Sequence, residues 1–154
     1  SQGKTCQEKL AIMKDSRIGV MGCVALILAI LVKTVCMARI LELRMPLMLL
    51  LFPAAGRWAQ VFSYVFSPYV RKGGTGEIFA KAADRRALVI ASATLVPFCA
   101  VSGFLAGMLA LVLFLALFRK YAHHQIGGIT GDVLGATTVL SEIVLLGAAL
   151  LCGR

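Results

Sequence analysis

The stretch ALVIASATLVPFCAVSGFLAGMLALVLFLALF, residues 87–118, decides the fold, because it is 32 residues long and has no charged side chain. As one helix it would be roughly 48 Å long, whereas the hydrocarbon core of a bilayer is about 30 Å thick. Pro97 and the Ser102-Gly103 pair lie near its centre, and both features interrupt helices. We therefore predict two membrane helices joined by a tight turn, at about 87–101 and 103–118.

Three further stretches of about 20 mainly apolar residues, the length that spans a bilayer as a helix, flank this segment at 18–38, 46–66 and 133–152. Each has one charged residue inside it, which is Lys33, Arg57 or Glu142 in turn. We therefore expect an all-α fold, a polytopic transmembrane helical bundle of about five spans. It would form a single membrane domain over residues 1–154.

The composition agrees with a membrane protein. Hydrophobic residues make up 60% of the 154 residues and charged residues 15%, and the mean hydropathy is +0.90. A soluble domain has about 45–50% apolar and about 25% charged residues. The net charge of +9 would suggest nucleic acid in a soluble protein, but here the basic residues lie at the ends of apolar stretches. We therefore expect contact with membrane lipid and no nucleic-acid partner.

The basic residues also predict the orientation. With five spans, the segments 1–17, 67–86 and 119–133 share one side of the membrane. They hold 11 of the 16 basic residues, which are Lys4, Lys9, Lys14, Arg17, Arg71, Lys72, Lys81, Arg85, Arg86, Arg119 and Lys120. Because cytoplasmic loops carry an excess of Lys and Arg, we expect this side to face the cytoplasm.

A glycine-rich segment, GGITGDVLGAT at residues 127–137, precedes the last span. Its glycines at 127, 131 and 135 have the spacing that lets helices approach closely. Asp132 lies among them, where a carboxylate beside open space could hold a hard cation such as Mg²⁺. Helix packing, with Asp132 favoured by the helix dipole, explains the same residues, and the pattern alone leaves both interpretations open.

Two charges lie deep within the predicted spans. On a helix, Glu142 shares one face with Asp132, Gly135 and Thr138, and it lies about 15 Å further along. Arg57 lies near the centre of its own span, at a similar depth. A charge inside a membrane needs a partner, so one interpretation is an Arg57–Glu142 ion pair that fixes how two helices pack, and the other is a separate catalytic role for each residue.

The segment IMKDSRIG, residues 12–19, stands where the chain enters the first span. Asp15 or Ser16 could cap a helix there, while Lys14 and Arg17 contact lipid headgroups. The alternative is a site at the membrane surface, with Asp15 on a metal or hydroxyl and Arg17 on a phosphate.

Two segments together resemble the cobalamin synthase family, the adenosylcobinamide-GDP ribazoletransferases. They are KLAIMKDSRIGVMG at residues 9–22 and GGITGDVLGATTVLSE at residues 127–142. Between them, PAAGRWAQV at 53–61 and YVRKGGTGEIF at 69–79 are similar to the middle region of the family. The resemblance covers almost the whole chain and keeps the order of the family.

The resemblance implies an integral enzyme of the bacterial or archaeal cytoplasmic membrane, with its motif loops facing the cytoplasm. Such an enzyme acts late in the assembly of cobalamin (vitamin B12). It joins adenosylcobinamide-GDP to α-ribazole or its 5'-phosphate and releases GMP, with Mg²⁺ as cofactor.

The matched motifs imply site residues. We expect catalytic roles for Asp15, Asp132 and Glu142, with Mg²⁺ held by Asp132 and Asp15. We expect the substrate to contact Lys14, Ser16, Arg17, Arg57 and Thr130.

The sequence departs from the family in one respect. The family carries an acidic DGLAD-type motif upstream of its KDSRIG segment, and these 154 residues contain none. We therefore expect the chain to correspond to the C-terminal part of the enzyme, so that the N-terminal acids either come from another chain, which supplies the missing N-terminal half, or are lost. A non-enzymatic membrane transport or assembly component is the alternative, which predicts polar residues spread through the spans rather than gathered at one membrane face.

Overall fold

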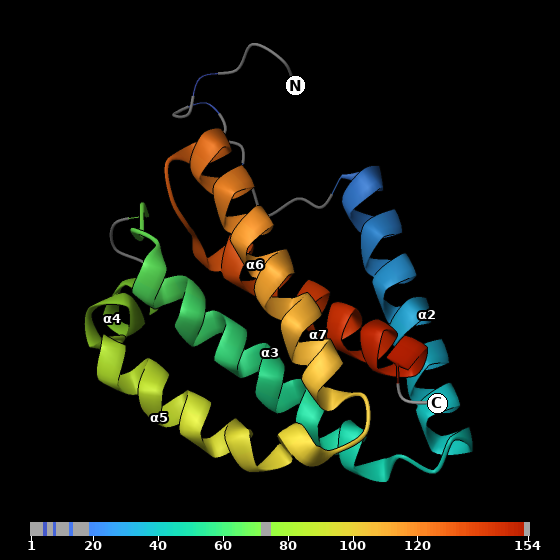
Figure 1. Ribbon diagram of the computed structural model, residues 1–154. Coiled ribbons are helices and arrows are strands. Elements are labelled where there is room, and N and C mark those ends of the chain that lie inside the picture. Colours follow the sequence, from blue (N-terminus) through green and yellow to red (C-terminus); the bar gives the residue numbers. More distant parts are fainter. Residues whose placement is uncertain (1–4, 6–7, 9–12, 14–18, 72–74, 153–154) are drawn as a thin grey trace.

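The computed structural model describes residues 5, 8, 13, 19–71 and 75–152. Long helices make up nearly all of it (Figure 1). The elements are α2 (Val20–Glu42), α3 (Pro46–Phe66), α4 (Thr75–Ala82), α5 (Arg85–Leu95), the 3-10 helix η1 (Val96–Ala100), α6 (Phe104–Ile126) and α7 (Gly131–Cys152). Within the described residues there is no strand beyond one isolated β-bridge, so the all-α prediction is confirmed.

The long apolar stretch breaks where the sequence predicts. α5 ends at Leu95, η1 contains Pro97, and α6 begins after Gly103. Proline has no N–H to donate to a preceding turn, and it clashes with the carbonyl four residues earlier. Gly103 has a φ of 76°, a left-handed conformation that glycine adopts without steric cost. The predicted break of residues 87–118 into two helical segments is therefore confirmed.

α6 is longer than predicted. The prediction placed its end at residue 118, where the charges begin, but the helix continues to Ile126. Arg119 and Lys120 are good helix formers, so a change from apolar to basic residues does not end a helix. The helix ends at Gly127, which has a φ of 76° and donates its N–H to the His123 carbonyl at 3.0 Å.

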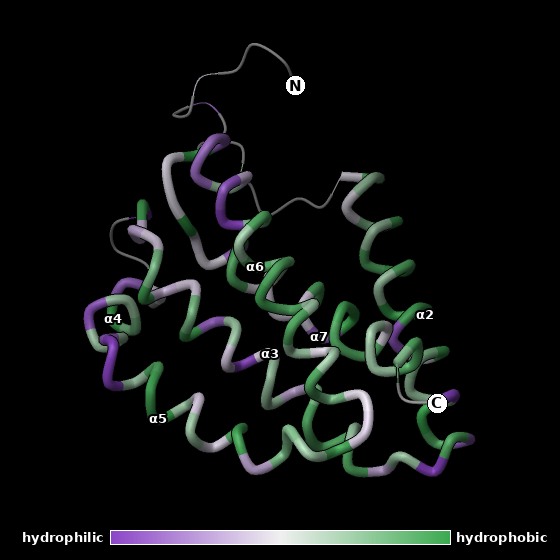
Figure 2. The backbone as a smooth tube through the Cα atoms, in the orientation of Figure 1, coloured by the Kyte–Doolittle hydropathy of each residue, from purple (hydrophilic) through white to green (hydrophobic). Residues whose placement is uncertain are grey.

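The elements run back and forth between two ends of the bundle. Segments 67–71, 75–86 and 119–133 lie at one end, called the basic end below, and the turns at 43–45 and 101–103 lie at the other (Figure 1). Figure 2 shows hydrophilic residues gathered at the basic end, over α4, the start of α5 and the end of α6. This arrangement agrees with the predicted grouping of these two loops.

The core forms around α7, which packs against α2, α3 and α6. Leu145 and Ala149 of α7 are fully buried. Gly107 of α6 faces Leu145 so closely that an added Cβ would lie 3.1 Å from the Leu145 Cγ. α5 packs against α3, where the indole N–H of Trp58 donates to the Ser92 hydroxyl at 2.9 Å.

Among the described helices, three rather than five are long and apolar enough to cross a membrane, and these are α2, α6 and α7. The predicted span 87–101 is not one of them, because α5 has 11 residues and is therefore about 16 Å long. The predicted span 46–66 coincides with the 21-residue helix α3, but this helix carries Arg57 and Gln60 and is not among the three. The structure is thus a helical membrane bundle with three candidate spans.

Glycine substitutions test the turn before α6. An added Cβ at Gly103 would lie 2.7 Å from the Ala149 carbonyl oxygen, in addition to the left-handed φ. At Gly127 only the φ is unfavourable, and at Gly147 the surrounding space is open. We expect Gly103→Ala to lower the thermal unfolding midpoint in detergent most. Gly127→Ala should cost about 1–2 kcal/mol, and Gly147→Ala should be neutral or stabilising. Equal midpoints for the Gly103 and Gly147 variants would contradict this packing.

Candidate functional site

Two loops that are far apart in the sequence dock against each other at the basic end. Tyr69 and Ile129 form a parallel β-bridge. The Val70 N–H donates to the Ile129 carbonyl at 3.0 Å, and the Ile129 N–H donates to the Pro68 carbonyl at 2.9 Å. An added Cβ at Gly128 would lie 2.3 Å from the Pro68 carbonyl oxygen, so only glycine allows this approach. The docked loops are called the bridged loops below.

Thr130 connects the bridged loops to α7. Its hydroxyl accepts a hydrogen bond from the Val133 N–H at 3.4 Å, and its carbonyl accepts one from the Leu134 N–H at 3.0 Å. A threonine that accepts from the third residue of a helix is a typical N-cap. Thr130 is 1% exposed, so it is a buried cap at the start of α7. Its predicted contact with substrate stays a prediction.

The bridged loops place Arg71 beside Asp132, with 3.5 Å between the guanidinium Nη1 and the carboxylate Oδ2. The side chains are 39% and 58% exposed, so both are open to a ligand. From the sequence alone, Arg71 was predicted only as one of the charges of a cytoplasmic loop. Its position in the YVRKGGTGEIF segment was the signal that could have marked it as a site residue.

The predicted metal site is described only in part. Asp132 is its described member, whereas Asp15 lies outside the described residues, together with Lys14, Ser16 and Arg17. Among the described residues there is no group of three His, Cys, Asp or Glu side chains that could hold a metal ion. Asp132 therefore offers one carboxylate, and the Mg²⁺ assignment stays a prediction.

A hollow of about 580 Å³ opens between α3, α4 and α7, next to Asp132. It is lined by Arg57, Gln60, Val61, Tyr64, Gly76, Phe79, Ala82, Ala83, Ala87, Gly131, Leu134 and Gly135. The Arg57 Nη1 lies 3.4 Å from the Gln60 Oε1, one turn further along α3. The structure therefore places Arg57, a predicted substrate contact, in the wall of a ligand-sized space.

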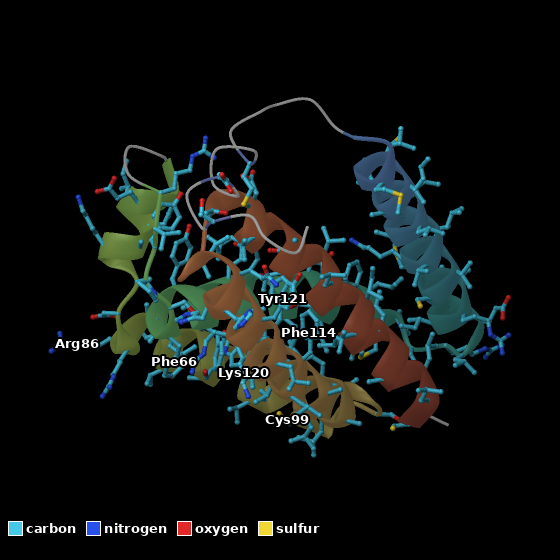
Figure 3. All side chains as sticks on the ribbon, turned by 90° about the horizontal axis from the view of Figure 1, so that it is seen from above. Phe66, Arg86, Cys99, Phe114, Lys120 and Tyr121 are labelled. Atoms are coloured by element: carbon cyan, nitrogen blue, oxygen red, sulfur yellow. The ribbon has the colours of Figure 1, made fainter. Side chains whose placement is uncertain are left out.

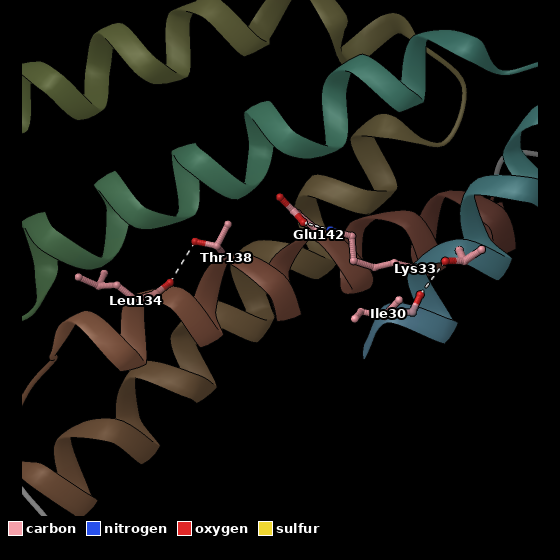
Figure 4. A network of polar contacts seen from close by, with 6 residues as sticks. Ile30, Lys33, Leu134, Thr138 and Glu142 are labelled. Atoms are coloured by element: carbon pink, nitrogen blue, oxygen red, sulfur yellow. Dashed lines mark hydrogen bonds and ion pairs between the residues drawn. The ribbon is translucent and has the colours of Figure 1, made fainter. Parts of the chain in front are cut away.

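The predicted Arg57–Glu142 ion pair is wrong. Glu142 pairs with Lys33 of α2, with 2.5 Å between the Lys33 Nζ and the carboxylate Oε2 (Figure 4). Gly56 is the α3 residue that faces Glu142, since an added Cβ there would lie 2.9 Å from the Glu142 Cγ. The next residue of a helix points about 100° away, which directs Arg57 into the hollow instead.

Glu142 makes a structural contact between two helices. The residue is 8% exposed and joins α7 to α2, and it is not among the residues that line the hollow. Its predicted catalytic role stays a prediction. The pair neutralises two charges inside the bundle, as a charge within a membrane requires.

The fold and the site together define a helical membrane protein with a ligand-sized hollow and an Arg–Asp pair at one end. Residues 1–150 match the family model described as cobalamin-5-phosphate synthase, and the chain belongs to this family. No solved structure matches the chain.

Curated relatives are named adenosylcobinamide-GDP ribazoletransferase. The chain is 39% identical to the protein of Syntrophobacter fumaroxidans over 93% of its own length and 59% of the relative. It is 38% identical to that of Pseudomonas fluorescens over 94% of its own length and 61% of the relative. It is 35% identical to that of Geotalea daltonii over 89% of its own length and 56% of the relative. The chain thus spans 56–61% of the length of these three relatives.

A double-mutant cycle tests the Lys33–Glu142 pair. Lys33→Met and Glu142→Gln should each destabilise the protein, because the first leaves the buried Glu142 carboxylate and the second the half-buried Lys33 ammonium without its partner. The double variant should regain part of the loss, with a coupling of about 0.5–3 kcal/mol in thermal or denaturant unfolding. The matched control is the cycle of Arg57→Met with Glu142→Gln, which should be additive within about 0.5 kcal/mol. Additivity in the Lys33–Glu142 cycle together with coupling in the Arg57–Glu142 cycle would show that Glu142 pairs with Arg57 instead.

Proposed function

We propose that this chain carries the reaction centre of an adenosylcobinamide-GDP ribazoletransferase. Such an enzyme joins adenosylcobinamide-GDP to α-ribazole or its 5'-phosphate and releases GMP. The observation that carries the proposal is the docking of the bridged loops, which sets Arg71 beside Asp132 at the edge of the hollow. The names of the relatives and the family match support it.

The reaction is a substitution at phosphorus. A ribose hydroxyl oxygen attacks the phosphorus nearer the corrinoid, the bond from this phosphorus to the GMP oxygen breaks, and the hydroxyl proton is released. Catalysis of this kind depends mainly on positioning and on charge stabilisation. The exposed guanidinium of Arg71 would hold a phosphate oxygen. Its pairing with Asp132 directs it towards the start of α7, whose N-terminus also favours negative charge.

The surroundings of Asp132 fit Mg²⁺. This ion is usually held by one or two carboxylates with waters and substrate phosphates. Asp132 is 58% exposed, and Gly135, one turn away, has nothing within 4 Å of an added Cβ, so there is room for a hydrated ion. Asp132, with Asp15 as the second predicted ligand, would hold it. When bound, the ion would neutralise charge on the phosphates.

The alternative of a transport or assembly component predicts polar residues along the spans. Figure 2 shows the hydrophilic residues mainly at the basic end. The deep charge Glu142 is neutralised by Lys33, and Arg57 opens into the hollow next to Asp132. This distribution favours an enzyme that works at one membrane face.

We further propose that the chain crosses the cytoplasmic membrane five times, with the basic end in the cytoplasm. α5 and η1 together are about 26 Å long, close to the thickness of the hydrocarbon core. α3 places Arg57 and Gln60 in the wall of the hollow. Figure 3 shows Arg86 extending away from the body of the bundle beside α4 and α5, where it could reach lipid headgroups.

Cysteine labelling tests this topology. In a cysteine-free background, Lys81→Cys and His124→Cys should both react with an impermeant reagent applied from the cytoplasmic side. Glu42→Cys at the other end should react only from the opposite side. Reaction of Lys81→Cys and His124→Cys from different sides would refute the five-span arrangement.

The substitution Asp132→Asn tests the proposed site. It keeps the size of the side chain and removes the charge that pairs with Arg71 and would hold Mg²⁺. In membranes carrying the protein in its full native reading frame, ribazole transfer should fall by about 100-fold or more, with unchanged insertion and unfolding midpoint. The control is Glu42→Gln, which also replaces a carboxylate by an amide but lies at the end of the bundle opposite the basic end. Near-normal turnover of Asp132→Asn at limiting Mg²⁺ would exclude Asp132 from the site.

A further inference from the structure

A small cavity lies next to the bridged loops, where the end of α3 meets α6 and α7. Its volume is about 10 Å³. The residues that line it include Ser63 and Ser67 at the end of α3, Arg119 of α6, Ile129 of the bridged loops and Thr137 of α7. A cavity needs about 10–15 Å³ to hold one water molecule. The space therefore suits a single water or a small ion and is too small for an organic ligand.

Three of the lining residues carry hydroxyl groups and are buried. Ser63 is 9% exposed, Ser67 is 7% exposed and Thr137 is 1% exposed. Buried polar groups in folded proteins nearly always have a hydrogen-bond partner. The Ser67 hydroxyl is buried and has no partner within the part of the chain that the structure describes. This hydroxyl is therefore the group in the cavity wall that needs a ligand.

The hydrogen bonds already made by the other two hydroxyls determine what they can offer a ligand. The Ser63 hydroxyl donates to the Ala59 carbonyl at 2.8 Å, and the Thr137 hydroxyl donates to the Val133 carbonyl at 2.7 Å. A hydroxyl has one hydrogen and two lone pairs, so Ser63 and Thr137 can now only accept. Ser67 can still donate. A ligand that satisfies all three hydroxyls must both donate and accept hydrogen bonds.

This combination excludes the simple ions. A chloride ion only accepts, so it would leave the Ser63 and Thr137 oxygens without a donor. A cation such as Na⁺ or ammonium cannot accept from Ser67, and the positive charge of Arg119 in the cavity wall disfavours it further. A water molecule both donates and accepts, and buried waters typically make about three hydrogen bonds. Water is therefore the ligand that matches the wall.

We propose that this cavity binds one water molecule, which accepts a hydrogen bond from the Ser67 hydroxyl and donates to the hydroxyl oxygens of Ser63 and Thr137. The water links the end of α3 to α7. Ser67 directly precedes Pro68, whose carbonyl accepts from the Ile129 N–H. The water thereby supports the start of the bridged loops from below. The site is separate from the hollow and does not depend on the proposed function.

The sign of a stability change tests the water at Ser67. In a cavity without water, Ser67→Ala removes a buried hydroxyl that has no partner, which should leave the protein equally stable or more stable. With the water bound, the same change removes a hydrogen bond. For the protein in its full native reading frame, in detergent, the thermal unfolding midpoint should then fall by about 2–4 °C. An unchanged or higher midpoint would overturn the proposal.

Ser141→Ala is the matched control. The Ser141 hydroxyl is also buried without a partner in the described part of the chain, but it lines neither the hollow nor this cavity. Its loss should leave the midpoint unchanged or raise it. An equal fall in the Ser67 and Ser141 variants would also count against the water, because the effect would then not depend on the cavity.

Two adjacent threonines test whether one water joins α3 to α7. Thr137 and Thr138 are both buried, and each donates to the carbonyl four residues earlier, but only Thr137 lines the cavity. Thr137→Val should lower the midpoint, and combined with Ser67→Ala it should lower it by less than the sum, because both changes act on the same water. Thr138→Val combined with Ser67→Ala should be additive. Additive losses in both combinations would refute the shared water.

A high-resolution map of the same protein gives the direct test. It should show one peak in the cavity, about 2.5–3.0 Å from the hydroxyl oxygens of Ser63, Ser67 and Thr137. The absence of a peak would refute the site. In crystals grown with bromide in place of chloride, an anomalous signal at the peak would identify an anion and would likewise refute the water.

Discussion

The close packing of α3 and α6 on α7 is the constraint on which the rest of the structure depends. Gly56, Gly103 and Gly107 face α7, and an added Cβ at each would come within 3.1 Å of it. Without a hydrophobic driving force inside a membrane, helices associate through such close contact of small residues. The glycines therefore set the distances of α3 and α6 from α7, and on α3 it is Gly56, not Arg57, that faces Glu142.

The candidate site follows from this packing. α3 and α6 both end at the basic end, where the Arg119 guanidinium donates to the Phe66 carbonyl at 3.2 Å. The chain segments that follow these two helices are thereby held close enough to pair through Tyr69 and Ile129. Arg71 follows two residues after Tyr69 and Asp132 three residues after Ile129, so the backbone bridge brings their side chains within reach of each other.

The helices could be predicted from the sequence because their signals are local. Charge-free stretches, Pro97 and Gly103 mark where helices lie and break, and each signal stands next to the residues it affects. The partner of Glu142 could not be predicted in this way. In the predicted span 18–38 Lys33 stands near one end, so Arg57 was the candidate at the depth of Glu142, but α2 runs from Val20 to Glu42 and places Lys33 near its middle. The rotation of each helix about its axis then decides which cation meets Glu142. Arg71 was missed for a related reason, since its contact with Asp132 depends on how two loops dock.

The glycines at 127, 131 and 135 show how far a spacing motif can be interpreted. Their spacing favours close helix packing as much as an open site, and the structure separates the three positions. Gly127 ends α6, whereas Gly131 and Gly135 line the hollow. A glycine leaves space beside its helix, and the helix that stands opposite determines whether that space is filled by close packing or stays open. Opposite these glycines stands α3 with Arg57, Gln60 and Tyr64, so a packed helix contact would bury polar groups against bare backbone at a cost. The polar face of α3 is therefore the feature that leaves this part of the motif as the wall of an open hollow rather than as a helix interface.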